Sequence, residues 1–536
     1  MILNAENLKN KQFWGPAGIS IPRYDFAAMA DRTRKSPIWV HFGAGNIFRA
    51  FIAALQNSLL NEGHADKGII VTETFDYEII DKIYAPHNNL ILNATLNSDS
   101  TADLEILAPL AESLNADMNE PEAIARLSEI FAAESLQMAS FTITEKGYSI
   151  LNAGGGLSGL AKSDIDGGPN KARHAMGIVA AMLYKRFLAG AYPMALVSMD
   201  NCSHNGDKLK APIIEIAKHW AGHGFVEKDF ISYLEDSSKI SFPWSMIDKI
   251  TPRPAKAVED MLAAKGISNI SPIITEKGTY TAAYVNAERP QYLVVEDSFP
   301  NGRPALEKSG VYFTTRETVD KVERMKVTTC LNPLHTAMSV YGCLLGYNLI
   351  CDEMEDKEIR ELVYRLGYIE GLPVVTNPGS IEPIKFLDEV FNERLPNPFM
   401  PDSPWRIAVD TSQKVGIRFG ETIKSYIEMG LNLEGLVSVP LAIAGWFRYL
   451  LGVDDFGGGF AVSNDPMKEE LQALLKGVAW DDKNSYQGQL RKILSNPIIF
   501  GLDLTQTILA NKVEAMFTEL LNGAGSVRAV LQKYLT

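Results

Sequence analysis

Cysteine is scarce in this chain, and its few cysteines form no recognisable pattern. The 536 residues contain four, namely Cys202, Cys330, Cys343 and Cys351. No two of them have the CxxC spacing typical of zinc sites, so we expect reduced thiols of a cytoplasmic protein rather than disulfides or a zinc cluster. No metal is expected elsewhere, because His219 and His223 have helical spacing but lack a third ligand or an HExxH glutamate.

The chain also lacks a long uninterrupted apolar run and an excess of positive charge. Its most apolar stretch, residues 436–453, contains Pro440 and Arg448, and therefore predicts a buried helix rather than a membrane span. The first thirteen residues are too polar for a signal peptide. A formal net charge of -14 argues against nucleic acid or an anionic membrane as partner. We expect a small-molecule substrate and a monomer or small homo-oligomer.

Length and patterning indicate two domains. A chain of 536 residues, 46% of them hydrophobic, is too long for one core. Short β-branched runs alternate with helical segments up to the Gly/Pro-rich loop 297–308, which is typical of an α/β fold with a largely parallel sheet. Helical periodicity dominates from about residue 315. We predict an N-terminal Rossmann-type dinucleotide-binding domain over residues 1–305 and a mostly α-helical C-terminal domain over residues 306–536.

A strand, a turn, a helix and a second strand follow one another early in the chain. The apolar run 38–42 precedes Gly43-Ala44-Gly45-Asn46, an apolar-periodic helix over 47–60 and a strand over 68–72. Two glycines allow a tight turn and let the backbone approach a pyrophosphate at the helix N-terminus. Phe48 replaces the third glycine of the usual fingerprint, so the unit is a partial dinucleotide motif.

An acidic residue ends the second strand of this unit. Glu73 stands where a carboxylate can accept hydrogen bonds from the ribose hydroxyls and repel a 2′-phosphate, which favours NAD over NADP. Asp76 is the alternative for this role. The alternative interpretation of Glu73 is a solvated acidic residue at the end of a strand, without a role in cofactor binding.

Near the middle of the chain, Lys326, Asn332 and His335 fall within ten residues, and Glu323 lies one turn before the lysine. A lysine can exchange a proton, an amide can polarise a carbonyl and an imidazole can hold a hydroxyl. Together they could reduce a ketone or oxidise a secondary alcohol without a metal. Taken alone, the segment is better explained as a salt-bridged helix with a capping asparagine and an unrelated histidine, since such triplets are common.

Three further groups of polar residues are candidates. The segment 198–206 follows an apolar strand and is dense in amides, among them Asn201, although a polar turn explains it too. Asp248 precedes a Pro-containing turn and is uninformative alone. Arg406 and Lys414 could clamp a carboxylate or several hydroxyls, whereas exposed surface cations are the default.

In order along the chain, these segments resemble the polyol-specific long-chain dehydrogenases, a family that includes mannitol 2-dehydrogenase and hexuronate reductases. The family patterns are GxGxxxRA, TITExGY, CDNxxxNG, DRITP and IEDxFxxGRPxxExxGV. Their counterparts are residues 43–50 (GAGNIFRA), 142–148 (TITEKGY), 199–206 (MDNCSHNG), 248–252 (DKITP) and 295–311 (VEDSFPNGRPALEKSGV). The lysine helix and the Arg–Lys pair follow, so the resemblance runs over about residues 38–414.

The resemblance implies a role for each matching residue. Lys326 is expected to be the acid/base, Asn201 and Asn332 to polarise the reacting oxygen, and Glu323 to pass protons to solvent. The residues implied in substrate binding are His335, Arg406, Lys414 and Asp248. Those implied in NAD binding are Gly43, Gly45, Asn46, Arg49, Glu73, Asp76 and Glu145.

One spacing departs from the family. The family places its lysine and asparagine five residues apart, whereas Lys326 and Asn332 are six apart and Pro333 follows. On an unbroken α-helix the extra residue would rotate Lys326 by about 100° relative to Asn332. We therefore predict a π-type bulge or a helix restart, with Asn332 as N-cap and Pro333 at the first helical position.

The substrate is expected to be a keto-uronate. Segments 73–77 and 325–335 are most similar to those of the hexuronate reductases that interconvert D-fructuronate and D-mannonate with NAD. The alternatives within the family are a mannitol 2-dehydrogenase or a tagaturonate reductase. Outside it, the alternative is a non-catalytic sensor of sugar acids or nucleotides.

Overall fold

The computed structural model describes residues 1–535 and divides into two compact units. The N-terminal unit comprises Met1–Leu96 and Thr101–Asp320, and the C-terminal unit comprises Asn97–Ser100 and Lys321–Thr536. The division falls at 320/321, whereas the sequence analysis placed the boundary at 305/306. Strand β15 (Tyr312–Thr314) pairs in parallel with β14 (Tyr292–Glu296), and this pairing keeps the segment after residue 305 in the N-terminal unit.

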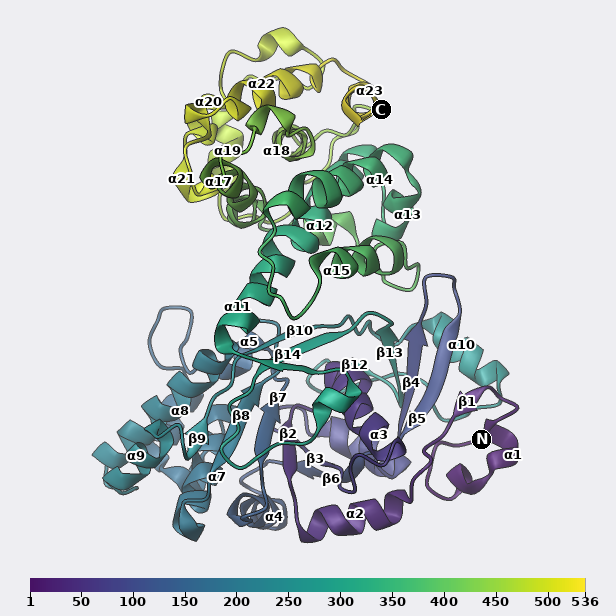
Figure 1. Cartoon of the computed structure of the whole chain (residues 1–536), viewed down its shortest axis with the longest axis vertical. Helices are drawn as coiled ribbons and strands as arrows, with labels where there is room; N and C mark the ends of the chain where they lie inside the picture. The colour runs from purple at the N-terminus through teal and green to yellow at the C-terminus, as the bar shows by residue number, and fades with distance from the viewer. Residues whose placement is uncertain (536) are drawn as a thin grey trace. The chain divides into compact units, whose positions relative to one another are not determined.

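A six-stranded sheet forms the centre of the N-terminal unit (Figure 1). Its strands, in spatial order, are β6 (Leu110–Asn115), β3 (Ile69–Glu73), β2 (Trp39–Phe42), β7 (Met138–Phe141), β8 (Met194–Ser198) and β9 (Ile240–Ser241). All five neighbouring pairs are parallel. In chain order the strands run 3-2-1-4-5-6, which is the Rossmann arrangement. The fold class expected from the sequence is thereby confirmed.

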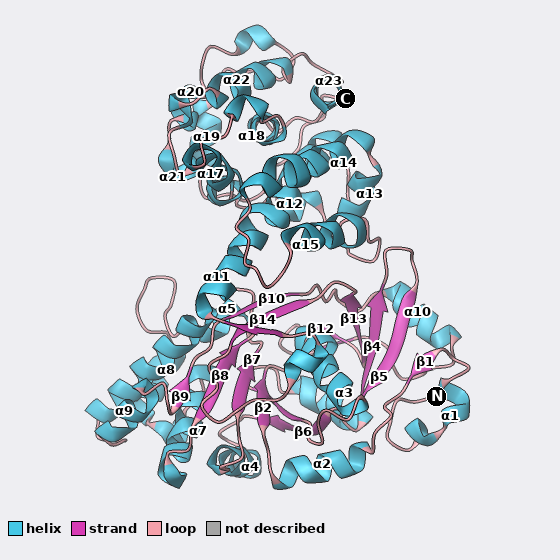
Figure 2. Ribbon diagram, viewed as in Figure 1, coloured by secondary structure: helices cyan, strands magenta, loops and turns pink. Residues whose placement is uncertain are grey.

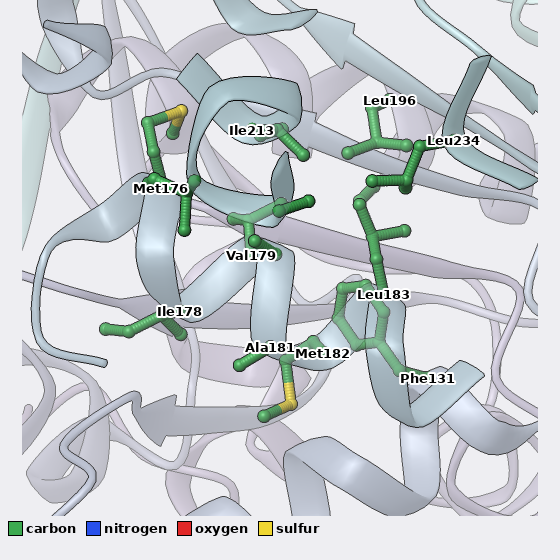
Figure 3. Packing of buried hydrophobic residues seen from close by; sticks show 14 of the residues in the cluster. Phe131, Met176, Ile178, Val179, Ala181, Met182, Leu183, Leu196, Ile213 and Leu234 are labelled. Atoms are coloured by element: carbon green, nitrogen blue, oxygen red, sulfur yellow. The ribbon is translucent and has the colours of Figure 1, made fainter. Parts of the chain in front are cut away.

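Four helices cover the part of this sheet that contains β7 and β8. They are α4 (Pro121–Ala132), α7 (Ala175–Gly190), α8 (Asn205–Gly222) and α9 (Lys228–Glu235). Figure 3 shows Val179 and Leu183 of α7 beside Leu196 of β8, Ile213 of α8 and Leu234 of α9. All five side chains are fully buried. The apolar runs of this region therefore serve the core that supports the carboxyl ends of the strands.

A buried arginine joins two connections of the sheet. The guanidinium group of Arg186, on α7, donates to five backbone carbonyls and lies between the α4–β7 and α7–β8 connections. The acceptors are the carbonyls of Phe131, Ala133, Leu136, Tyr192 and Pro193, at 2.7–3.0 Å. Because one guanidinium group donates to carbonyls of both connections, Arg186 links the two connections inside the unit.

Two smaller sheets and a short hairpin complete the strands of this unit. One sheet has the order β1 (Ile19–Ser20), β5 (Ala102–Leu107), β4 (Ile91–Leu96) and β13 (Tyr284–Glu288). The other has the order β10 (Ser245–Asp248), β14 and β15, and β11 (Ile273–Ile274) pairs with β12 (Tyr280–Thr281). The sequence analysis did not resolve the first sheet, whose strands come from distant segments.

The remaining helices of the N-terminal unit are short. The α-helices are α1 (Lys11–Trp14), α2 (Phe26–Lys35), α3 (Ala53–Asn61), α5 (Thr144–Tyr148), α6 (Gly159–Gly167) and α10 (Lys256–Ala264), and α11 (Arg316–Met325) crosses the division between the units. The other helical turns are η1 (Asn7–Lys9), η2 (Phe48–Ile52), η3 (Ile80–Tyr84), η4 (Ala85–His87), η5 (Pro169–Lys171) and η6 (Leu306–Ser309). Of these, η2 and η3 are π-helical turns.

The C-terminal unit contains helices and no regular strand over residues 321–535 (Figure 2). Its α-helices are α12 (Asn332–Leu345), α13 (Ile350–Glu355), α14 (Lys357–Tyr364), α15 (Pro383–Glu389), α16 (Pro404–Ile407), α17 (Glu421–Glu428), α18 (Ser438–Leu450), α19 (Lys468–Leu474), α20 (Arg491–Leu494), α21 (Pro497–Phe500), α22 (Leu509–Glu519) and α23 (Ser526–Leu535). Its π-helical turns are η7 (Lys326–Cys330), η8 (Arg365–Gly371), η10 (Val390–Arg394) and η12 (Gly416–Gly420), and its 3₁₀ turns are η9 (Leu372–Val374), η11 (Thr411–Gln413), η13 (Leu433–Gly435), η14 (Lys483–Ser485) and η15 (Leu504–Gln506).

Helix α18 is the core helix of this unit and confirms the buried helix predicted for residues 436–453. Every one of its residues is buried. The buried carboxylate of Glu370 accepts hydrogen bonds from the backbone amides of Val437, Ser438 and Val439 at 2.6–2.9 Å. These amides at the start of the helix have no acceptor within the helix itself. Across residues 1–535, no helix has both the length and the apolar character needed to cross a membrane.

Candidate active site

The turn after β2 has the geometry of a dinucleotide-binding loop. Gly43 has a φ of +102°, and a Cβ atom there would lie 2.2 Å from the carbonyl oxygen of Thr142, so only glycine is tolerated. A Cβ at Gly45 would meet nothing within 4 Å. The loop lies between β2 and β7, where the strand order reverses and α/β folds bind their ligands. Asn46 begins the helix that follows.

Glu73 holds this loop in place. One carboxylate oxygen accepts the amide of Ala44 at 2.9 Å, and the other accepts the amides of Thr74 and Phe75 at 2.9 and 3.0 Å. The side chain is buried, and burial raises its pKa above the usual range despite these hydrogen bonds. The sequence analysis did not anticipate this clamp on the glycine loop. A contact between Glu73 and the ribose stays a prediction.

A cavity of about 360 Å³ lies beside the carboxyl end of β3. Its lining includes Asp76, Phe75, Arg173 and Lys277. One oxygen of the buried Asp76 accepts the hydroxyl of Thr275 at 2.7 Å, and the other has no hydrogen-bond partner within residues 1–535. A buried carboxylate oxygen of this kind is costly unless a ligand satisfies it. Asp76 is therefore at least as well placed as Glu73 to receive a ribose hydroxyl.

Two other residues expected at the cofactor have partners of their own. Arg49 is buried, and its guanidinium donates to the carbonyl of Ala283 at 2.9 Å and the hydroxyl of Thr281 at 3.4 Å. This is a contact with a distant segment, whereas the buried Nε of Arg49 has no hydrogen-bond partner within residues 1–535, and a role of Arg49 at the cofactor stays a prediction. Glu145 lies on α5, is largely exposed and pairs with Lys208 at 2.5 Å.

The loop after β8 is fixed by Asp200, next to the predicted Asn201. The carboxylate of Asp200 accepts the amides of Ile143 and Thr144 at 2.9 and 3.0 Å and the hydroxyl of Tyr148 at 2.5 Å. These contacts bind the 199–206 segment to the 142–148 segment, which explains why both motifs occur together. Asn201 itself is exposed at the carboxyl end of β8.

Asn205 anchors the other end of the same loop. Its buried amide nitrogen donates to the carbonyls of Ser198, Asp200 and Ser245 at 3.0–3.2 Å. A Cβ at Gly206 would lie 2.6 Å from the carbonyl oxygen of Phe242, so that position also requires glycine. Asn205 and Gly206 thus position the loop rather than bind a ligand. In the small sheet nearby, Asp248 is the last residue of β10 and is buried.

Lys326 begins the π-helical turn η7 in the C-terminal unit. It directly follows α11, on which Glu323 lies one turn earlier, and its side chain is only 3% exposed. Helix α12 then restarts at Asn332, with Pro333 in its first turn. The predicted departure from a regular α-helix is confirmed. The π-helical turn over Lys326–Cys330 is the bulge, and the start of α12 at Asn332 is the restart. The N-cap is Leu331 rather than Asn332, one residue earlier than predicted.

His335, on the first turn of α12, is a neutral imidazole at pH 7. Burial lowers its pKa to about 4, against the opposing effect of Asp402. A neutral imidazole can both donate and accept a hydrogen bond, as a ligand for hydroxyl groups must. The nearby arginines Arg394, Arg418 and Arg406 lower this pKa further.

The two predicted clamp cations already have partners. The guanidinium of Arg406 forms an ion pair with Asp402, and the Arg406 side chain is 66% exposed. The ammonium group of Lys414 donates to the carbonyls of Ile407 and Val409, and burial lowers its pKa. Arg406 therefore offers little net charge, while Lys414 is a partly buried donor.

Family models cover both units. A model described as the mannitol dehydrogenase Rossmann domain matches residues 37–308, and one described as the mannitol dehydrogenase C-terminal domain matches residues 318–521. Among solved structures, a substrate-free D-sorbitol dehydrogenase superposes with a TM-score of 0.80 at 26% identity, covering 99% of this chain and 100% of its own. The mannitol 2-dehydrogenase of Pseudomonas fluorescens, in complex with NAD and D-mannitol, shares the fold with a TM-score of 0.69 at 24% identity, and covers 99% of both chains.

Curated relatives match over nearly the whole length. The D-mannonate oxidoreductase of Thermotoga maritima is 48% identical over 536 residues, which is 99% of both chains. The D-mannonate oxidoreductase of Escherichia coli is 27% identical over 484 residues, 89% of this chain and 91% of its own. The resemblance noted in the sequence is confirmed by these matches, and the chain belongs to the mannitol dehydrogenase family.

Proposed function

We propose that this protein is an NAD-dependent oxidoreductase that interconverts D-fructuronate and D-mannonate. The observation that carries the proposal is the 48% identity, over the whole chain, to an enzyme named D-mannonate oxidoreductase. The glycine loop after β2 and the buried lysine on η7 supply the two chemical requirements of such a reaction. The four cysteines are free thiols, which suits a reducing compartment such as the cytoplasm.

The N-terminal unit offers the features that NAD requires. Gly45 leaves open space for a pyrophosphate at the start of the helix after β2, and the orphaned oxygen of Asp76 can accept a ribose hydroxyl. Gly43, Asn46 and Glu73 form or hold the loop. The nicotinamide of bound NADH supplies the hydride in reduction.

The C-terminal unit supplies the proton. In reduction, the ammonium group of Lys326 gives a proton to the oxygen of the substrate ketone, and in oxidation its amine accepts that proton. The family resemblance assigns to the amides of Asn332 and Asn201 the polarisation of the reacting oxygen, a role that stabilises developing negative charge. Glu323 passes protons between Lys326 and solvent.

The neighbouring residues bind the rest of the substrate. His335, neutral at pH 7, and the Lys414 ammonium hold hydroxyl groups, and Arg406 and Asp248 complete the set proposed to position the sugar. None of these steps requires a metal ion.

The test is a comparison of substrates with the purified full-length protein. NADH oxidation is followed at one enzyme concentration with D-fructuronate, D-tagaturonate and D-fructose. We expect the highest kcat/KM with D-fructuronate. A preference for D-tagaturonate would indicate a tagaturonate reductase, and a preference for D-fructose a mannitol 2-dehydrogenase. No turnover with any of them, despite NADH binding, would favour a non-catalytic sensor.

A further inference from the structure

Arg418, which no sequence motif indicated, lies beside the proposed catalytic turn. It is on the π-helical turn η12, which packs against η7, the turn that begins with Lys326, and against α12. The guanidinium group of Arg418 donates to the hydroxyl of Thr336. That hydroxyl in turn donates to the carbonyl of Asn332 at 3.0 Å. Arg418 is thus two hydrogen bonds from Asn332, and its partner Thr336 is next to His335 in the chain.

The charge of Arg418 is not balanced by the protein. Within residues 1–535 it forms no ion pair, and burial lowers its pKa to about 10 with no acidic group opposing the change. The charge of Lys414, one turn earlier, adds to it, since burial and then the charge of Arg418 lower the pKa of Lys414. By contrast, Arg406 is paired with Asp402 and Arg324 with Glu421.

A half-buried guanidinium without a carboxylate is costly, and such a group is well suited to bind an anion from the ligand. Guanidinium also matches a carboxylate geometrically, because it can donate two parallel hydrogen bonds. The carboxylate of a hexuronate is the group that distinguishes it from an uncharged ketose or polyol. The surroundings of Arg418 therefore favour the charged substrate.

We propose that Arg418 binds the substrate carboxylate and sets the preference for hexuronates over uncharged sugars. This inference rests on the proposed function. It assigns the selectivity to Arg418 rather than to Arg406, whose charge is neutralised by Asp402. Arg406, His335 and Lys414 are left to bind groups that hexuronates and ketoses have in common.

The test compares Arg418→Gln with Arg406→Gln on D-fructuronate and D-fructose. For Arg418→Gln we expect KM for D-fructuronate to rise by about 10- to 100-fold, the value of a lost charge-assisted bond, with a smaller change in kcat. The loss of kcat/KM on D-fructose should be at least tenfold smaller. Arg406→Gln should lower kcat/KM for D-fructuronate and for D-fructose by similar factors. Equal losses for the two substrates in Arg418→Gln would overturn the assignment.

A conservative variant separates binding from folding. Arg418→Lys keeps the charge without the planar fork, so we expect an intermediate rise in KM for D-fructuronate alone and an unchanged melting temperature. Wild-type selectivity in this variant would overturn the inference, even if Arg418→Gln failed to fold. Failure of the wild-type enzyme to reduce D-fructuronate would instead refute the proposed function, so the two failures are distinguishable.

Discussion

The amide nitrogen of Leu331 donates to the carbonyl oxygen of Lys326 at 3.1 Å. This bond spans five residues, one more than in an α-helix, and so defines a π-helical turn. The widened turn absorbs the sixth residue between Lys326 and Asn332. We therefore expect Lys326 to keep the orientation relative to α12 that the five-residue spacing of the family would give.

Changing the length of this turn should have opposite effects in the two directions. Deletion of Val327 restores the five-residue spacing, so we expect a regular helix and activity within about tenfold of wild type. Insertion of one alanine after Val327 adds a residue that the turn cannot absorb, and rotates Lys326 by about 100°. Turnover should then fall at least 100-fold. The measurement is kcat for both variants, with circular dichroism as a control for folding. An inactive deletion variant would contradict the proposal that the π-helical turn absorbs the extra residue.

Replacement of Lys326 by alanine should remove the proton donor without affecting the cofactor. Because general acid/base groups contribute roughly 10²–10⁴ in rate, we expect kcat to fall by two or more orders of magnitude. NADH binding, followed by fluorescence titration, should stay within a few-fold of wild type. Lys385→Ala, at an exposed lysine on α15, is the matched control. Near-normal turnover in Lys326→Ala would exclude this lysine as the acid/base.

Glu73 should act on both the loop and the cofactor preference. Glu73→Ser removes the acceptor of the Ala44, Thr74 and Phe75 amides, so we expect a lower melting temperature and weaker NADH binding. Loss of the negative charge should also reduce the difference in kcat/KM between NADH and NADPH. Glu73→Gln keeps one acceptor oxygen and should show the reduced difference with a smaller loss of stability. A wild-type enzyme equally active with NADPH would argue against any ribose role of Glu73.

Glu353 should make the stability of the enzyme depend on pH. It lies on α13, fully buried, and neither carboxylate oxygen has a hydrogen-bond partner within residues 1–535. Burial, with smaller contributions from Asp356 and Asp352, raises its pKa well above the usual value of 4.5. A raised folded-state pKa means that its contribution to stability is complete below the unfolded-state pKa and is lost as the pH rises through the folded-state pKa.

Glu353→Gln removes this titration. We therefore expect the melting temperature of the variant, relative to wild type, to increase as the pH rises from 4.5 towards the raised pKa of Glu353. Glu428→Gln, at an exposed glutamate of α17, should show no such trend. A difference between Glu353→Gln and wild type that is constant over this range would show that Glu353 does not titrate on unfolding.

The sequence predicted the parts of the fold that local patterns determine. The strands at 38–42 and 68–72, the buried helix α18 and the break after Lys326 follow from apolar runs, turn residues and an unusual spacing. The family assignment followed from motifs in a fixed order. Local patterns did not reveal the sheet of β1, β5, β4 and β13, because its strands are brought together from distant segments.

The site was predicted less completely, for the same reason. Lys326 and Asn332 stand close in sequence, whereas the unbalanced charge of Arg418 becomes visible only when η12 packs against η7. Arg49 was expected at the cofactor from the family motif, and its contact with Ala283, far along the chain, could not be seen in the sequence. Likewise, the role of the Asp200 carboxylate is visible only in the structure, where it binds the backbone amides of Ile143 and Thr144 in the 142–148 segment.

The five carbonyls bound by Arg186 have a consequence for how the N-terminal unit folds. They come from two connections that are separated by the whole of α7. The loss of water from the buried guanidinium is fully compensated only when both connections are in place. We therefore expect the connections that lead into β7 and β8 to form in one cooperative step of folding.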